Sequence, residues 1–537
     1  MLKIILSKMS FLKGKGYKLI WTVALLVSFL LIILNVLYTS SVLQTEQVIL
    51  QANKYKNLYY MLCIFFFGVI LFLIVRHNGK LCANNLFLVF SIFYLILGLY
   101  LIFNIDTTIR DDAYAVKSAA VDFSNHDYHS LDEGEYLFRF PYQLGMVTYD
   151  RILGLFSKNT QFIFLVNLFE IIGINWFCYK LTDLIFSHNH NINLISIFLS
   201  FSCLPQFFFM TFAYGTIPGF FFLIAGLFML CSYTLKKKIR TLFWGVILLT
   251  TAVVLRNNFI IGILAVLIYL LLKSIEERES KYIFAAFLLF FSCIIATKGM
   301  YSYYSIESGK EINSGVPSVL YIAMGINPEN DDLRAPGWYD GTVWFDYTDS
   351  GFDYDIAYKT GIDSIIASLE YYKDNPDKAV SFFKRKVISM WCEPMYQSTW
   401  SGPLEYFEQH VYTKLLYSVY NDGILGKIFS YCMKGWLVLI LLSSFVFLIC
   451  TRKTFSHFHI VFYLYFIGGF LFHLFWEGKS QYVYSYIYIL IPCCAYGVNK
   501  ALEKLLFFSG KLGYNKLRKN YILNGGRIHV SFSSRDA

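Results

Sequence analysis

Long apolar runs, each close to the length that crosses a lipid bilayer, recur from one end of this chain to the other. A helix that spans the hydrocarbon core needs about 20 predominantly apolar residues. Such runs fall at 18–40, 57–76, 85–105, 160–186, 191–210, 214–235, 241–256, 257–273, 281–298, 427–450, 457–476 and 482–499. Within the bilayer, the side chains of such runs face lipid or other helices. The backbone forms helices, because no water is present in the hydrocarbon core to hydrogen-bond with it. The sequence therefore predicts an all-α polytopic membrane protein with about twelve transmembrane helices, or one fewer if the two short runs around Arg256 form a single interrupted span.

The composition supports a membrane protein and argues against a nucleic-acid-binding protein and a disulfide- or zinc-stabilised protein. Only 15% of the residues are charged, against about 25% in ordinary soluble domains. A net charge of +10 is compatible with nucleic-acid binding in a soluble protein, but here the basic residues sort by side of the membrane, so we expect no nucleic acid as a partner. The 11 Cys residues contain no CxxC pair, so they predict neither a zinc site nor a disulfide framework.

The charges of the short loops predict the orientation. Cytoplasmic loops carry an excess of Lys and Arg. Lysines precede the first run, and alternate loops after it are also basic, namely 76–80, 236–240, 273–281 and 452–453. We therefore expect a multi-pass protein of the cell membrane with both termini in the cytoplasm.

Two long polar segments then fall outside the cytoplasm and define the expected domain organisation. A transmembrane module, 1–298, contains a first outer loop at 106–141. A mixed extracytoplasmic segment, 299–426, is long enough for a small domain. The last helices, 427–499, lead into a basic cytoplasmic tail, 500–537.

Further elements are expected inside these outer segments. A short helix should begin near Asp111 and Asp112, and the stretch 141–156 should lie along the outer membrane interface, because it has helical spacing and is too short to span. A second helical stretch should run from Asp377 to Trp391, with the basic residues 384–386 on a solvated face.

The first outer loop carries the most informative chemistry. Asp106, Asp111 and Asp112 follow directly after the third apolar run. A helix dipole favours the ionised forms of carboxylates in its first turn. An ionised carboxylate at a membrane surface can accept a proton from a hydroxyl nucleophile. The sequence therefore places its candidate catalytic groups here.

This arrangement resembles the GT-C superfamily of membrane glycosyltransferases, which contains the protein O-mannosyltransferases and the lipid A aminoarabinose transferases. Asp112, within the pattern DxxxVxxAA, fits the family's acidic position best, with Asp111 and Asp106 as alternatives. The resemblance continues through four further segments, namely Tyr136–Gly145, Met324–Gly341, Phe382–Trp400 and Trp476–Pro492. It implies an inverting enzyme that moves a sugar from a polyprenyl-phosphate donor to an extracytoplasmic glycan or lipid acceptor.

A polyprenyl-phosphate donor also needs cations at the bilayer surface and an apolar groove for its tail. Arg256 is our preferred contact for the donor phosphate. A charged residue between two apolar runs is energetically costly, so such residues mark functional sites. Lys298, Lys479 and Arg139 are the other candidates, and Arg110 lies in the same outer loop. Relatives in the superfamily often have a Glu followed by Arg-Tyr before the last span. Here Glu477 is present, but Gln481 and Tyr482 stand at the Arg-Tyr position, so Lys479 is the expected substitute.

Alternatives remain open at this point. A polysaccharide polymerase or ligase also has about a dozen spans and a large outer loop, but it centres its key arginines in the late loop. A non-enzymatic transporter or flippase for lipid-linked sugars would bury charges near the midplane, where Glu170 is the one candidate. No metal-ligand spacing is present, yet Asp106, Asp111 and Asp112 together are able to hold a divalent ion.

Overall fold

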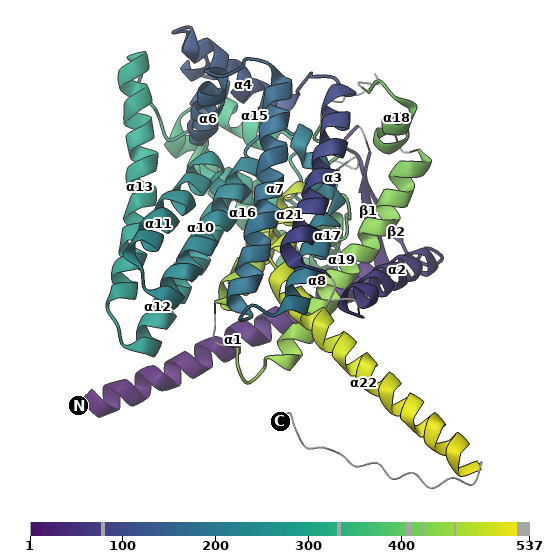
Figure 1. Ribbon diagram of the computed structural model, residues 1–537. Helices are drawn as coiled ribbons and strands as arrows, with labels where there is room; N and C mark the ends of the chain where they lie inside the picture. The colour runs from purple at the N-terminus through teal and green to yellow at the C-terminus, as the bar shows by residue number, and fades with distance from the viewer. Residues whose placement is uncertain are drawn as a thin grey trace.

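The computed structural model describes residues 2–523 except 44, 77–80, 330–333, 403–410, 422 and 456–457, and it describes side chains between 14 and 507. The described chain is almost entirely helical (Figure 1). Its first helix begins, and its last helix ends, at one end of the molecule, and the helices α4 and α6 lie at the opposite end. We call the latter the outer end.

Eight helices of the described residues are long and apolar enough to cross a membrane. They are α1 Leu2–Leu37, α2 Asn57–Arg76, α3 Ala83–Phe103, α7 Thr160–Ile185, α10 Thr216–Lys236, α12 Ile260–Glu277, α13 Lys281–Ser308 and α19 Ile424–Cys450. A ninth crossing is possible where α8, His190–Phe201, continues through Leu204–Thr211 after a bend of 52°. The prediction of an all-α, multi-pass membrane protein is therefore confirmed, and the count of twelve spans stays a prediction.

The remaining predicted runs also form helices, with shorter or broken geometry. α11, Ile239–Leu255, and α20, His459–Phe475, are apolar but shorter than the other spans. The last run covers α21, Ser480–Tyr488, and the start of α22, Ile491–Leu523. At Arg256 the chain leaves α11 in an extended conformation, with φ −153°, and then enters a 3-10 turn before α12. The two short runs are thus separate helices rather than one continuous one.

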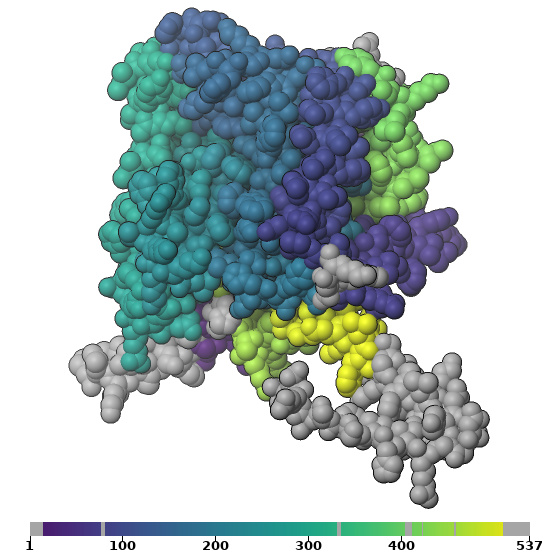
Figure 2. Space-filling model, viewed as in Figure 1, coloured from purple at the N-terminus to yellow at the C-terminus, as the bar shows by residue number. Residues whose placement is uncertain are grey.

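The outward faces of the long helices are apolar. On α2, α3 and α13 most of the exposed side chains are large and apolar, such as Phe65, Ile96 and Ile295. In the space-filling view, α3 and α13 form a large part of the visible surface (Figure 2). Apolar groups that point away from the protein interior over whole helices require a lipid solvent.

The first outer loop folds as the sequence predicted. α4 is Asp111–Ser124, and α6 is Leu144–Gly154, with the short helix α5, Tyr136–Arg139, and a 3-10 turn between them. Val116, Ala119 and Ala120 are buried on the face of α4 that packs against α6. Small side chains allow close helix approach, so this part of the DxxxVxxAA pattern seats α4 and fixes where its first turn points.

The segment between α13 and α19 differs from the mixed structure that we expected. Its secondary structure, in the part that the structure describes, is helical apart from two single bridge residues. Its helices are α14 Ser318–Ile326, α15 Thr342–Asp349, α16 Tyr354–Asp374, α17 Pro376–Trp391 and α18 Lys414–Tyr420. The stretch predicted from Asp377 to Trp391 is confirmed as α17. The hairpin of β1, Tyr38–Val42, and β2, Val48–Ala52, was not predicted, and it packs against α17.

A buried lysine ties these distant segments together. Lys434 of α19 is fully buried, and its amine donates to Asn35 Oδ1 at 2.7 Å, to Tyr38 O at 2.8 Å and to Cys392 O at 3.1 Å. These acceptors belong to α1, β1 and the residue after α17. One amine thus fixes how the hairpin and the late helices meet.

Removal of this amine should destabilise the fold. Lys434→Met removes three hydrogen bonds and leaves Asn35 Oδ1 and Tyr38 O without this donor, while Cys392 O keeps the backbone N–H of Ser40. Two unsatisfied groups at about 1–3 kcal/mol each should cost roughly 2–6 kcal/mol. Thermal unfolding of the purified protein in detergent should show a clear drop in midpoint. Lys427→Met, an exposed lysine of the same helix, is the control and should leave the midpoint nearly unchanged. Equal unfolding midpoints for both variants would contradict a stabilising role of the Lys434 amine.

Candidate active site

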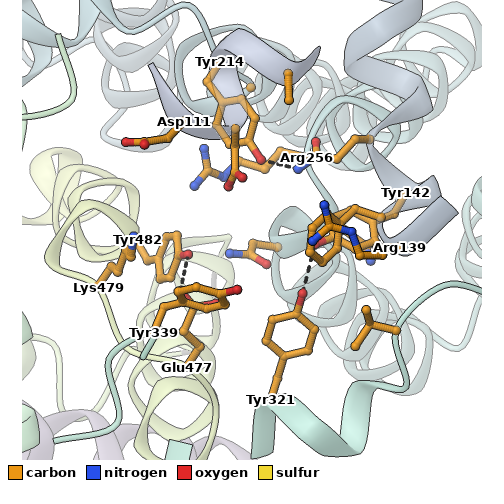
Figure 3. Close-up of a pocket in the computed structure, with 18 of the residues that line it drawn as sticks. Asp111, Arg139, Tyr142, Tyr214, Arg256, Tyr321, Tyr339, Glu477, Lys479 and Tyr482 are labelled. Atoms are coloured by element: carbon orange, nitrogen blue, oxygen red, sulfur yellow. Dashed lines mark hydrogen bonds between the residues drawn. The ribbon is translucent and has the colours of Figure 1, made fainter. Parts of the chain in front are cut away.

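A cavity of about 670 Å³ opens between the outer ends of the helices. Its walls come from the start of α4, the α5–α6 turn, the break at Arg256, α14 and the 476–482 loop (Figure 3). Among the described lining residues, four are acidic and four are basic: Glu46, Asp111, Asp112 and Glu477, and Arg139, Arg256, Arg334 and Lys479. The sequence separation from 46 to 479 shows that only the tertiary fold assembles this set.

Asp112 lies in the first turn of α4 and faces the cavity. Its side chain is exposed to the cavity, but protein surrounds it closely, and this partial desolvation raises its pKa above the ordinary value. Lys479, the Tyr136 hydroxyl and Arg256 act in the opposite direction, and Asp111 reinforces the rise. A raised pKa brings a carboxylate closer to the range in which a general base works well at neutral pH.

Asp111 precedes it in a strained conformation. Its φ is +53°, a left-handed value that is uncommon outside glycine, Asn and Asp. Strain of this kind costs of order 1 kcal/mol or more and clusters at functional sites. Here the turn at Asp111 allows both adjacent carboxylates to line the cavity.

Arg256 reaches the cavity from the break between α11 and the turn before α12. Its guanidinium lies 5.3 Å from the ring centre of Tyr214 and 5.5 Å from that of Tyr482. It also donates to the Thr216 hydroxyl. Figure 3 shows Tyr214 and Tyr482 on different sides of the open space around it. Cation–π contacts hold the planar group while leaving donor atoms for an anion.

Lys479 is the second cation near Asp112. Its amine forms an ion pair with Glu46 Oε1 at 2.8 Å, and Arg334 lies 3.3 Å from Glu46 Oε2. Burial favours the neutral form of Lys479, but the charges of Glu46 and Glu477 outweigh it and raise its pKa. Lys479 is therefore charged at physiological pH.

Glu477 sits on the loop between α20 and α21. It accepts a hydrogen bond from the Tyr482 hydroxyl at 3.1 Å, and burial raises its pKa. The loop is held from behind, because Gly478 N donates to Gly337 O at 2.8 Å, and Lys386 donates to Trp476 O at 2.7 Å. These hydrogen bonds hold the loop that carries Glu477 against the segments around Gly337 and Lys386.

Lys386 corrects one expectation. It was placed with its neighbours on a solvated face, but its side chain is fully buried. Besides Trp476 O, its amine binds Gly325 O at 2.5 Å, and burial lowers its pKa to about 7 against the opposing charge of Glu477. The helical periodicity of α17 was correct, but the contacts that bury Lys386 come from residues far away in sequence.

Aromatic side chains complete the walls. The hydroxyls of Tyr142 and Tyr321 lie 3.5 Å apart, and the Tyr321 ring stacks on Trp476 at 5.3 Å. Arg139 stacks over Trp344, 4.1 Å from the ring centre, and its side chain also lines the cavity. Flat apolar faces with polar edges suit a sugar ring, which has an apolar face and hydroxyls around its rim.

Three sequence candidates do not line this cavity. α13 continues to Ser308, beyond the end that we predicted at 298, so Lys298 lies within the helix and is exposed. Asp106 accepts from the backbone N–H and hydroxyl of Thr108 at 3.0 and 3.1 Å. Arg110 stacks on Trp400, 4.4 Å from its ring centre, so it contributes through that cavity-lining ring.

Two charged residues of the cavity were missed from the sequence. Glu46 is brought in by the turn of the β1–β2 hairpin, and Arg334 follows α14. A signal for Glu46 existed, since it is the only acidic residue between the first two apolar runs. Arg334 had none, because it is one of many polar residues in a long loop.

The acidic residues of the first outer loop do not all line the cavity. Among the described residues, no three His, Cys, Asp or Glu side chains converge as metal ligands. Asp106 faces Thr108 rather than the cavity, which separates it from Asp111 and Asp112. The basic side chains that line the cavity are the groups that can contact an anionic ligand.

Comparisons with known proteins add no family to this geometry. No protein-family model matches the chain. No curated protein matches it either.

Proposed function

We propose that this protein is a membrane glycosyltransferase that moves a sugar from a polyprenyl-phosphate donor to an acceptor outside the cytoplasm. The observation that carries the proposal is the convergence of Asp112, Arg256 and Lys479 in one cavity at the outer end. Transfer of a sugar from a polyprenyl phosphate requires a base for the hydroxyl nucleophile and cations for the phosphate leaving group. Aromatic walls that suit a sugar ring surround these charges.

In the proposed reaction, Asp112 accepts the proton of an acceptor hydroxyl. The hydroxyl oxygen attacks the anomeric carbon from the face opposite the phosphate, and the bond between that carbon and the phosphate oxygen breaks. The configuration at the anomeric carbon inverts. The proton ends on Asp112, and the electron pair of the broken bond leaves with the polyprenyl phosphate.

Arg256 and Lys479 would hold that departing phosphate, which gains negative charge in the transition state. Preorganised cations in a site shielded from bulk water stabilise such charge without reorganising. Arg139 is the next cation in the cavity. Glu46 keeps the Lys479 amine in place through its 2.8 Å ion pair.

The membrane arrangement belongs to the same proposal. Twelve spans would put both termini in the cytoplasm, and the cavity at the outer end of the molecule would then face the compartment where lipid-linked sugars are consumed. The apolar outer surfaces of the helices would leave the donor's polyprenyl tail in contact with lipid.

Turnover by purified protein tests the function. We would incubate the protein with a panel of radiolabelled polyprenyl-phosphate sugars and envelope acceptors, and measure donor binding and sugar transfer separately. Transfer by the wild type supports the proposal. Donor binding with no transfer would favour a carrier or flippase, and transfer that extends a polymer chain would favour a polymerase or ligase.

The pH dependence of turnover should identify the base through its neighbours. A base works when deprotonated, so the rate falls as pH drops through the pKa of Asp112. Lys479 lowers that pKa and Asp111 raises it. Lys479→Met should therefore move the acid limb to higher pH, and Asp111→Asn should move it to lower pH. Profiles of kcat at saturating donor measure both shifts, and shifts in the same direction would remove Asp112 as the titrating base.

A further inference from the structure

A second, smaller cavity of about 140 Å³ lies between α4, α6 and the start of α7, apart from the candidate active site. Its polar lining includes Asp150 and Arg151 of α6, Lys117 of α4 and Lys158 of the following loop. A water molecule occupies roughly 30 Å³ of liquid, so this space can hold a small polar group larger than one water.

Asp150 makes this cavity unusual. Its side chain is only 6% exposed, and neither carboxylate oxygen has a hydrogen-bond partner among the described residues. Burial raises the pKa of this carboxyl to about 7, and a cationic donor beside it would stabilise its ionised form. Lys117 acts on it electrostatically, but its amine is turned to the Thr160 hydroxyl. The cavity therefore offers an unused acceptor to a cationic or N–H donor.

The same cavity also offers cations. The Arg151 guanidinium is fully engaged by Glu307, with two bonds of 2.8 Å. Lys117 and the exposed Lys158 carry charge that no carboxylate pairs within ion-pair distance in the described residues. One side of the cavity thus attracts an anion, and Asp150 attracts a cation. A small zwitterion satisfies both.

The rim of this cavity is apolar and points outward. Leu155, which lines it, is 82% exposed, and the adjacent Phe156 is 76% exposed. They directly follow α6, the helix that we place along the outer membrane interface. Such side chains would enter the boundary between headgroups and acyl chains. The apolar rim therefore favours a lipid over a soluble zwitterion.

We propose that the cavity between α4, α6 and α7 binds the headgroup of an amine-bearing phospholipid. Its ammonium donates to Asp150, its phosphate contacts Lys117 and Lys158, and its acyl chains lie against Leu155 and Phe156. The proposal does not depend on sugar transfer at the other cavity. The bound lipid would join α4, which carries Asp112, to the interfacial helix.

Lipid binding to delipidated protein tests this site. Native mass spectrometry and thermal unfolding would compare short-chain phosphatidylethanolamine, phosphatidylglycerol and phosphatidylcholine, together with soluble phosphoethanolamine. We expect phosphatidylethanolamine to bind best and to raise the unfolding midpoint. Asp150→Asn should reduce the preference for phosphatidylethanolamine over phosphatidylglycerol about tenfold, since a charge-assisted hydrogen bond is worth that much. Lys158→Gln, an exposed substitution, should weaken both lipids.

The controls are Asp127→Asn and Lys54→Gln, two exposed residues that do not line this cavity, and both variants should bind all lipids as the wild type does. Equal affinity for phosphatidylcholine and phosphatidylethanolamine would overturn amine recognition. An unchanged preference in Asp150→Asn would overturn the role of Asp150. Soluble phosphoethanolamine binding as tightly as the lipid would overturn the lipid as the occupant. The absence of binding by any of these ligands would overturn the proposed site.

Discussion

Asp112→Asn should reduce sugar transfer by about 10²–10⁴-fold, the range that a positioned base typically contributes. The amide keeps the shape of the side chain and its place in the first turn of α4, but it cannot accept the acceptor's proton at neutral pH. Donor binding should persist, because the proposed phosphate contacts lie on other segments. Single-turnover transfer and equilibrium donor binding, measured on the same preparation, separate the two effects.

Two further variants control for position and for charge. Asp127→Asn removes an exposed carboxylate of the same outer loop that pairs with His129, and it should transfer sugar at the wild-type rate. Asp111→Asn keeps a residue type that tolerates positive φ, so the strained turn survives. Its loss should be much smaller than that of Asp112→Asn. A larger loss in Asp111→Asn would transfer the base role to Asp111.

Arg256→Ala should weaken donor binding by about 10–100-fold, because hydrogen bonds to charged groups contribute about 1.5–3 kcal/mol. Turnover at saturating donor should fall as well, since the developing charge on the phosphate loses a cation. Arg256→Lys should restore only part of the affinity. A lysine keeps the charge but lacks the planar group that contacts Tyr214 and Tyr482.

Lys298→Ala provides the matched control for this prediction. Lys298 was a sequence candidate for the same role, but it is exposed on α13 and does not line the cavity. Its donor affinity should equal that of the wild type. If Lys298→Ala and Arg256→Ala lost affinity equally, the donor phosphate would bind outside the cavity.

The elements that the sequence predicted well are those with a local cause. Apolar length predicts a membrane helix, because a bilayer accepts only backbone that is hydrogen-bonded within itself. Helical spacing and the acidic first turn likewise predicted α4 and α6. Hydrophobic length did not predict the end of α13, because this helix continues beyond the apolar run 281–298 to Ser308.

The candidate site was predicted in part, since Asp112, Arg256, Lys479 and Glu477 do meet in one cavity. Each was conspicuous on its own, as a carboxylate at a helix start or a charge between apolar runs. Glu46 and Arg334 line the cavity but were not predicted, and the candidates Lys298 and Asp106 do not line it. Whether each of these four residues lines the cavity depends on the tertiary contacts of its segment.

The sequence by itself determined the membrane class, the helices and the acidic first turn of α4, since hydrophobic length and helix-end electrostatics act over a few neighbouring residues. The tertiary structure alone decided which charges share the cavity, that Lys386 is buried and that Asp150 lacks a partner. The reason is physical: burial and ion pairing depend on contacts between segments separated by hundreds of residues, such as Glu46 and Lys479. The residues next to a given position in the sequence do not predict those contacts.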